Sequence, residues 1–170
     1  MIEEPDPEYR TGIGTDIHLL VEGRKLMLGG VQLAYPAGLA GHSDGDAAIH
    51  AVIDALLGAS GMGDIGTVFP DNDPRYKGID SKQLLVEVKD RLEAAYWRVI
   101  NVDLIIQAEE PSLKPVKGQM KRVIAGLLGI DFTAVNVKAK TAEGLGDIGA
   151  GRAIAATAAV LLRKKARRRI

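Results

Sequence analysis

Three histidines that each lie close to aspartates are the residues of this sequence best suited to chemistry. His18 comes two residues after Asp16, and His42 opens an aspartate-rich run (42–46) that leads to His50. Two imidazoles and one carboxylate form a ligand set of catalytic zinc, and they leave one coordination position open for water or substrate. The clustering therefore predicts a metal site, and not three histidines that only pack in the core.

Residues 11–20 are predicted to form the strand that carries the first two ligands. The chain alternates there, and successive side chains of a strand point to opposite faces. Asp16 and His18 then share one face and can reach a common ion. The third ligand must come from another element, and the sequence alone does not rank His42 against His50.

A helix predicted over residues 46–57 presents His50 on its polar edge, opposite an apolar stripe. Ser43 is the predicted N-cap of this helix, and Gly58 is its predicted C-terminal cap. Asp46 and Asp54 lie four residues to either side of His50, so they share its edge. They are predicted to accept the second ring N–H of His50, as outer partners of metal-bound imidazoles do.

The rest of the chain alternates between strand and helix patterns. The predicted elements are an extended segment over 25–34 with a turn at Gly29 and Gly30, a helix over 81–96, a strand over 102–108, a helix from Pro115 to Gly129, and a strand over 135–141. Residues 153–162 are almost wholly apolar; their alanine content favours a helix, and a strand buried on both faces would give the same pattern. This order predicts a layered α/β or α+β domain.

Length and composition suit one compact domain of 170 residues. Lys plus Arg and Asp plus Glu number 22 each, so no net field favours nucleic acid or an acidic membrane as a partner. The absence of cysteine excludes disulfides and thiolate metal ligands. No apolar run approaches the roughly 20 residues that span a bilayer, and the acidic N-terminus is unlike a secretory signal, which predicts a cytoplasmic protein.

Two further segments are weaker predictors of a binding site. The glycine-rich loop 61–66 lets the backbone approach a ligand closely, yet it matches no phosphate-binding fingerprint. Lys138, Lys140, Thr141 and Glu143 lie at a predicted strand end, where they suit a phosphate and a second hard cation. Both segments are also compatible with ordinary solvated residues.

Taken together, four motifs resemble the 2-C-methyl-D-erythritol 2,4-cyclodiphosphate synthase family. They occupy residues 15–18, 40–50, 63–66 and 69–74. The resemblance covers residues 10–163, which leaves 1–9 as a flexible leader and 164–170 as a basic tail. It implies a single-domain α/β subunit (α+β, ferredoxin-like) whose mixed sheet is covered by helices on one face. It also implies that three such subunits form a homotrimer around the sheets, with active sites between subunits.

The activity that the resemblance implies is that of a phosphorus–oxygen lyase of the non-mevalonate isoprenoid pathway. The 2-phosphate of 4-diphosphocytidyl-2-C-methyl-D-erythritol 2-phosphate attacks the β-phosphorus, which closes a cyclic diphosphate and releases CMP. Two alternatives remain, one from the same broad chemistry and one from another class. One is a metal-dependent phosphohydrolase, and the other is a non-catalytic trimer that binds a nucleotide or isoprenoid phosphate.

The resemblance also assigns roles to individual residues. One zinc per subunit is implied at Asp16, His18 and His50, and a second divalent ion, Mg²⁺ or Mn²⁺, at Glu143. His42 and Thr141 are the implied catalytic contacts to the transition state. The implied substrate-binding residues are Asp16, His18, His42, Ser43, Asp64, Ile65, Gly66, Phe69, Pro70, Asp71, Asn72, Asp73, Ala108, Pro111, Lys114, Lys140, Thr141, Ala142 and Glu143.

The sequence departs from the family pattern in the glycine-rich segment 144–152. Asp147 stands where the family usually has Phe, and Ala150 stands where it has an arginine linked to isoprenoid diphosphates at the trimer axis. Arg152, two residues further on, is a candidate replacement at a different depth.

Overall fold

The computed structural model describes residues 7–164. The predicted leader and tail fall largely outside these residues, so the domain division stays a prediction. The strands are β1 (Tyr9–Glu22), β2 (Leu26–Leu28), β3 (Val31–Leu33), β4 (Ala37–Leu39), β5 (Trp97–Gln107), β6 (Val135–Lys140) and β7 (Ala153–Lys164). The helices are α1 (Ala47–Ser60), α2 (Ile65–Val68), α3 (Ser81–Ala94), α4 (Lys117–Leu128) and α5 (Gly146–Gly149), with 3-10 turns η1 (Pro74–Tyr76) and η2 (Phe132–Ala134).

A mixed five-stranded sheet in the order β4-β1-β7-β5-β6 forms the frame of the molecule. β1 is antiparallel to β4 and β7, and β5 is antiparallel to β7. β5 and β6 are parallel, and α4 supplies the crossover that a parallel pair requires. β2 and β3 form a separate hairpin. The predicted mixed α/β class is therefore confirmed.

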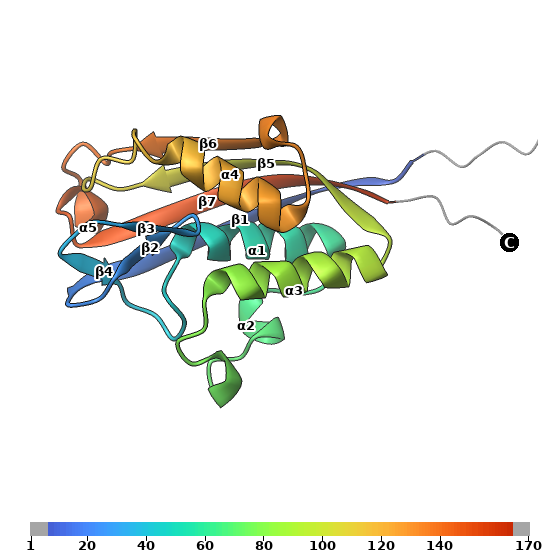
Figure 1. Cartoon of the computed structure of the whole chain (residues 1–170), viewed down its shortest axis with the longest axis horizontal. Helices are drawn as coiled ribbons and strands as arrows, with labels where there is room; N and C mark the ends of the chain where they lie inside the picture. Colours follow the sequence, from blue (N-terminus) through green and yellow to red (C-terminus); the bar gives the residue numbers. More distant parts are fainter. Residues whose placement is uncertain (1–6, 165–170) are drawn as a thin grey trace, which may run out of the picture.

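The helices α1, α3 and α4 lie on one face of this sheet (Figure 1). Leucine, isoleucine and valine side chains from α1, α3, β5 and β7 fill the layer between them. The other face carries apolar side chains that this chain leaves uncovered, with Ile13 73%, Ile17 57% and Leu19 58% exposed. None of the described helices is long and apolar enough to cross a membrane.

Two glycines allow β1 to lie directly against α1. A Cβ added to Gly12 would lie 2.0 Å from the carbonyl oxygen of Ala55, and one added to Gly14 would lie 2.2 Å from that of Ala51. Neither distance is compatible with a side chain, because real Cβ contacts are not under 3.0 Å. The predicted alternation of β1 is thus confirmed, with the glycine face turned to the helix.

Two local predictions need correction, and one open alternative is resolved. The N-cap of α1 is Asp46, whose side chain accepts from the N–H of Ile49, and not Ser43. Its C-cap is Gly61 with φ 75°, three residues beyond the predicted Gly58, because that left-handed conformation suits a glycine. Of the two structures compatible with 153–162, the chain forms the strand β7, which is central in the sheet and paired at both edges. Its side chains toward the helices are buried, and those on the other face are only partly covered in this chain.

Candidate metal centre and substrate cavities

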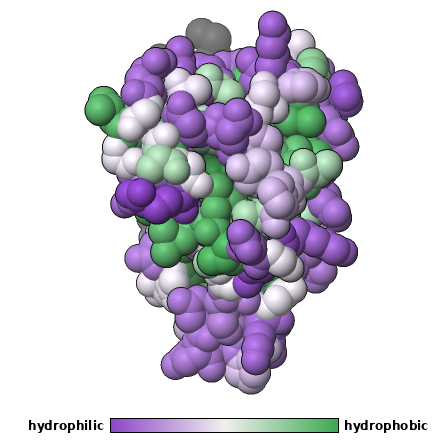
Figure 2. Space-filling model, turned by 90° about the vertical axis from the view of Figure 1, so that its left-hand side faces the viewer, coloured by the Kyte–Doolittle hydropathy of each residue, from purple (hydrophilic) through white to green (hydrophobic). Residues whose placement is uncertain are grey.

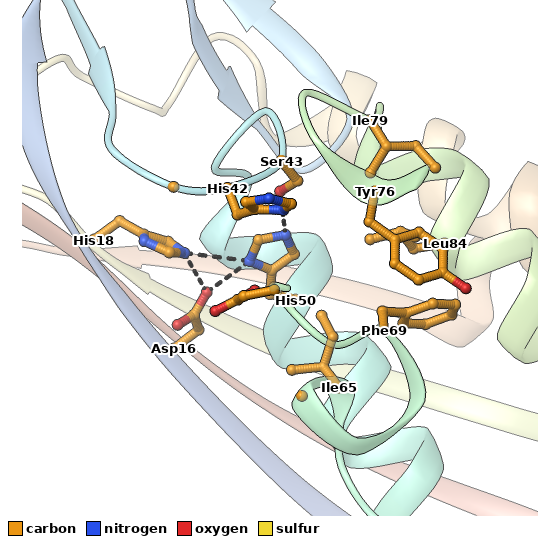
Figure 3. A pocket seen from close by; sticks show the side chains of 13 residues that line it. Asp16, His18, His42, Ser43, His50, Ile65, Phe69, Tyr76, Ile79 and Leu84 are labelled. Carbon is orange, nitrogen blue, oxygen red and sulfur yellow. Dashed lines mark hydrogen bonds and ion pairs between the residues drawn. The ribbon is translucent and has the colours of Figure 1, made fainter. Parts of the chain in front are cut away.

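Among residues 7–164, Asp16, His18 and His50 form the one group of three or more histidine and carboxylate side chains that is close enough to hold a metal ion together. The Oδ2 atom of Asp16 lies 2.8 Å from His18 Nε2 and 2.9 Å from His50 Nδ1, and the two ring nitrogens are 3.2 Å apart. β1 contributes the first two side chains and α1 the third, as Figure 3 shows. His42 lies outside this group, on the loop that follows β4.

Charge is concentrated between Asp16 and His50. Burial alone raises the pKa of a carboxyl group, but the hydrogen bonds from His18 and His50 outweigh it and hold the pKa of Asp16 well below its usual value. Burial likewise lowers the pKa of an imidazole, yet the bond to Asp16 and its negative charge raise the pKa of His50 above the usual value. The site therefore favours an ionised carboxylate, and a cation is the natural counter-charge beside it.

The second ring nitrogen of His50 lies within hydrogen-bonding distance of two serines, and not of the aspartates that the sequence predicts as its partners. Its Nε2 atom lies 3.0 Å from Ser43 Oγ and 2.9 Å from Ser81 Oγ. Asp46 instead caps α1 and accepts from the N–H groups of Gly29 and Gly30, which fixes the β2–β3 turn against the helix. Asp54 accepts from the N–H of Ile65 at 2.8 Å. The sequence prediction for both aspartates was wrong, because equal spacing along a helix does not fix which way a short side chain turns.

A cavity of about 310 Å³ opens over the three ligand-like side chains (Figure 3). Of the predicted substrate-binding residues, it is lined by Asp16, His18, His42, Ser43, Ile65, Gly66, Phe69 and Asp71. Asp64, Pro70, Asn72 and Asp73 belong to the same loops but do not line it. Asp64 caps α2, and Asp73 caps η1 and pairs with Arg75.

Sequence reasoning missed the apolar wall of this cavity. Tyr76, Ile79 and Leu84 line it, and the ring of Tyr76 packs edge-on against Phe69 with centroids 5.2 Å apart. Proximity to the turn at 69–74 was the one available signal for Tyr76. Leu84 lies in the predicted helix 81–96, and no local pattern distinguishes a core leucine from one at a cavity wall.

A second cavity of about 400 Å³ lies beside the end of β6 and shares no lining residue with the first. Ala108, Pro111, Lys114, Lys140 and Thr141, all predicted to bind substrate, line it. Ala142 and Glu143 follow directly along the chain. Glu143 has φ 51°, and its carboxylate accepts from the Thr141 hydroxyl at 2.9 Å. Glu109 turns toward the same loop and accepts from the N–H of Ala142.

The two cavities belong to opposite edges of the sheet. His42 follows β4 at one edge, and Thr141 follows β6 at the other. Four strand spacings separate these edges, which is about 19 Å.

Figure 2 views the end of the molecule that carries α5 and the β2–β3 hairpin, and hydrophobic surface runs through its middle between hydrophilic flanks.

Comparison with known proteins agrees with the resemblance seen in the motifs. The model of the YgbB family matches residues 9–163. The 2-C-methyl-D-erythritol 2,4-cyclodiphosphate synthase of Bordetella avium is 51% identical over 158 residues, 93% of this chain and 98% of that protein. The synthase of Treponema denticola is 48% identical over 153 residues, 90% and 95% of the two chains. A solved synthase structure in a CDP-bound form has a TM-score of 0.83 at 40% identity, and the match covers 90% of this chain and 99% of that one. The chain therefore belongs to the YgbB family.

Proposed function

We propose that this protein converts 4-diphosphocytidyl-2-C-methyl-D-erythritol 2-phosphate to the 2,4-cyclodiphosphate and CMP, as a phosphorus–oxygen lyase of isoprenoid biosynthesis. The observation that carries the proposal is the Asp16, His18 and His50 group at the floor of a cavity, in a chain about half identical to synthases along nearly its whole length. The metal-dependent phosphohydrolase and the non-catalytic binding trimer remain as outcomes of the test below. The cytoplasmic location stays a prediction.

The three ligand-like side chains fit a zinc ion. Tetrahedral ligands at the usual zinc distances lie about 3.3 Å from one another. The three donor atoms are 2.8 to 3.2 Å apart, so a slight spreading accommodates the ion. When bound, zinc polarises a phosphate oxygen as a Lewis acid. The carboxylate of Glu143 suits a harder second cation, Mg²⁺ or Mn²⁺, at the diphosphate.

The roles proposed for the chain's own residues are mainly positioning and charge stabilisation, which is what phosphoryl transfer asks of a protein. His42 and Ser43, at the cavity wall, contact the phosphate that is attacked. The 64–66 segment and Phe69 hold the erythritol, and their wall excludes water that would otherwise hydrolyse the substrate. Thr141 and the second cavity receive the cytidine diphosphate end; a related synthase structure that contains CDP supports a nucleotide site in this family.

The separation of the two cavities supports the proposed homotrimer of α+β, ferredoxin-like subunits. His42 and Thr141 are both proposed to contact the reacting diphosphate, which is short compared with the about 19 Å between the two sheet edges, so the two residues would come from neighbouring chains. The uncovered apolar face with Ile13, Ile17 and Leu19 is the surface proposed to pack around the axis. Light scattering is expected to give three times the 18.1 kDa mass of the chain; a monomer that is active at the same concentration would contradict the shared site.

The direct test is incubation with the diphosphocytidyl substrate, zinc and magnesium, followed by phosphorus NMR. A cyclic diphosphate together with CMP supports the proposed reaction. Inorganic phosphate as the product would identify a phosphohydrolase instead. Tight binding without any new phosphorus signal would identify a binding module.

Zinc affinity is expected to fall as the pH drops through the raised pKa of His50. Below that pKa the imidazole carries a proton on the nitrogen that faces Asp16, and zinc must displace it. Above it the affinity levels off, since a neutral imidazole is ready to bind. Competition titrations with a chelator between about pH 8 and about pH 6 measure this dependence. A constant affinity over that range would show that His50 is not among the ligands.

Arg24 is expected to affect turnover without affecting zinc. Its guanidinium donates to the carbonyl oxygens of Gly41 at 3.3 Å and Ser43 at 2.9 Å, so it fixes the loop that carries His42. Arg24→Met should lower kcat by roughly 10- to 100-fold, because small displacements of a catalytic group are costly. Steady-state kinetics and zinc content measure the effect, with Lys25→Met at the exposed neighbouring residue as the control. Equal kcat values for the two variants would refute this role.

A further inference from the structure

A buried serine connects the candidate metal centre to a carboxylate on a separate loop. Ser81 is the first residue of α3, and none of its surface is exposed. Its Oγ atom lies 2.9 Å from His50 Nε2, and its hydroxyl donates to Oδ1 of Asp44. His50, Ser81 and Asp44 thus form a continuous line of hydrogen bonds that leads away from the ligand atoms.

The number of available protons decides which atom donates and which accepts in each of these hydrogen bonds. Both oxygens of Asp44 already accept backbone N–H groups, Oδ1 from Asp46 and Oδ2 from Ser81, so this carboxylate acts as an acceptor throughout. A serine hydroxyl has a single proton, and Ser81 gives it to Asp44. Ser81 Oγ can then only accept from His50, which places a proton on Nε2. The other ring nitrogen, Nδ1, is left to face Asp16 and His18.

Ser43 fits the same arrangement from the other side. Its Oγ atom accepts from the N–H of Gly45 at 3.3 Å and lies 3.4 Å from Ser81 Oγ. It also lies 3.0 Å from His50 Nε2, so it can share the ring proton with Ser81. None of the buried side-chain polar atoms among the described residues lacks a partner, and the single hydroxyl proton of Ser43 has Ser81 Oγ as an acceptor when Nε2 carries its own proton.

We propose that Ser81 and Asp44 are positioning residues, which act through His50 to hold its ring with Nε2–H as a donor and Nδ1 aimed at the ion. This inference rests on the proposed zinc ligation by His50. Asp44 also anchors both helices that border the site, through the N–H of Asp46 before α1 and the N–H of Ser81 in α3. Ring orientation and helix placement are thus set by one carboxylate. Outer partners of this kind commonly contribute a factor of about 10 to 100 in metal affinity.

The test compares zinc binding of the full chain with that of Ser81→Ala, by competition with a chelator. The matched control is Ser60→Ala, another buried serine, whose hydroxyl donates to the carbonyl of Leu57 and touches no ligand. Ser81→Ala should bind zinc about 10- to 100-fold more weakly, with Ser60→Ala unchanged. Equal affinity of Ser81→Ala and the parent chain would overturn the proposal.

A second measurement needs no variant. The chain has three histidines, so nitrogen-15 labelling of histidine gives a simple ring spectrum of the zinc-loaded protein. A His50 Nε2–H signal that exchanges slowly with water is expected from its buried bond to Ser81, and fast exchange of this proton would also overturn the proposal. If the parent chain binds no zinc at all, the proposed metal role of His50 is wrong. If the parent chain binds zinc and Ser81→Ala binds it equally well, only the proposed positioning by Ser81 and Asp44 is wrong.

Discussion

Replacing His50 with alanine is expected to abolish binding of the proposed zinc and to reduce CMP formation by more than about 100-fold, since even an outer partner of a metal ligand can cost that much. His50 supplies one of three donor atoms, and the remaining pair, Asp16 and His18, comes from a single strand. Two ligands from one strand do not enclose an ion. Metal analysis of the purified variant and a CMP-release assay measure the two effects.

His42→Ala is the matched control, because it removes an imidazole from the same cavity without touching the three donor atoms. This variant should retain one zinc per chain and lose turnover, since His42 is proposed to contact the phosphate under attack. The opposite pattern, with zinc lost from His42→Ala and kept by His50→Ala, would reverse the ligand assignment. Zinc content thus separates two histidines that the sequence alone leaves as rivals.

Gly14→Ala is expected to destabilise the protein by about 3 kcal/mol or more, at or beyond the upper end of ordinary overpacking costs. The added Cβ would lie 2.2 Å from the oxygen of Ala51 and 2.5 Å from the nitrogen of Ala55, and both are backbone atoms of α1 that cannot turn aside. β1 must therefore move away from the helix. Since Asp16 is two residues along the same strand and His50 is on that helix, zinc affinity should fall as well.

Gly126→Ala provides the control for this change of residue type. Gly126 is exposed in α4, and a Cβ there would meet nothing within 4 Å. The same substitution should stabilise the protein by about 0.5–1 kcal/mol, because alanine loses less conformational freedom than glycine in a helix. Urea unfolding of both variants measures the difference. A Gly14→Ala protein as stable as Gly126→Ala would mean that β1 and α1 are not in contact at this point.

The parts of the site that the sequence predicts are the ligand-type residues whose relative positions are set by a single strand or helix. Asp16 and His18 share a strand face because strand geometry requires it, and His50 shares a helix with a clear apolar stripe. Their convergence, in contrast, depends on β1 packing against α1. Gly12 and Gly14 make that packing possible, yet the sequence does not show which element packs against a glycine.

The errors and the unresolved alternatives arose where tertiary contacts override local preference. Ala156 and Ala158 favour a helix in isolation, but β7 lies between β1 and β5 and under α1, where small side chains let the helix approach a fully paired strand. Ser81 carries no local signal of its role, since it is separated by 31 residues from the histidine that it contacts. Contacts of this kind become visible only once α3 is placed beside α1.

The donor atoms of Asp16 and His50 belong to residues 34 positions apart, on elements that meet only through packing. An ion held between them closes that stretch of chain into a ring. In the chain-entropy model, a covalent link across a ring of this size reduces the freedom of the unfolded chain by about 4 kcal/mol. In a protein without cysteine, the ion proposed for the reaction would thus also act as a removable cross-link between β1 and α1. The free energy of unfolding would then depend on the concentration of free metal in the cell.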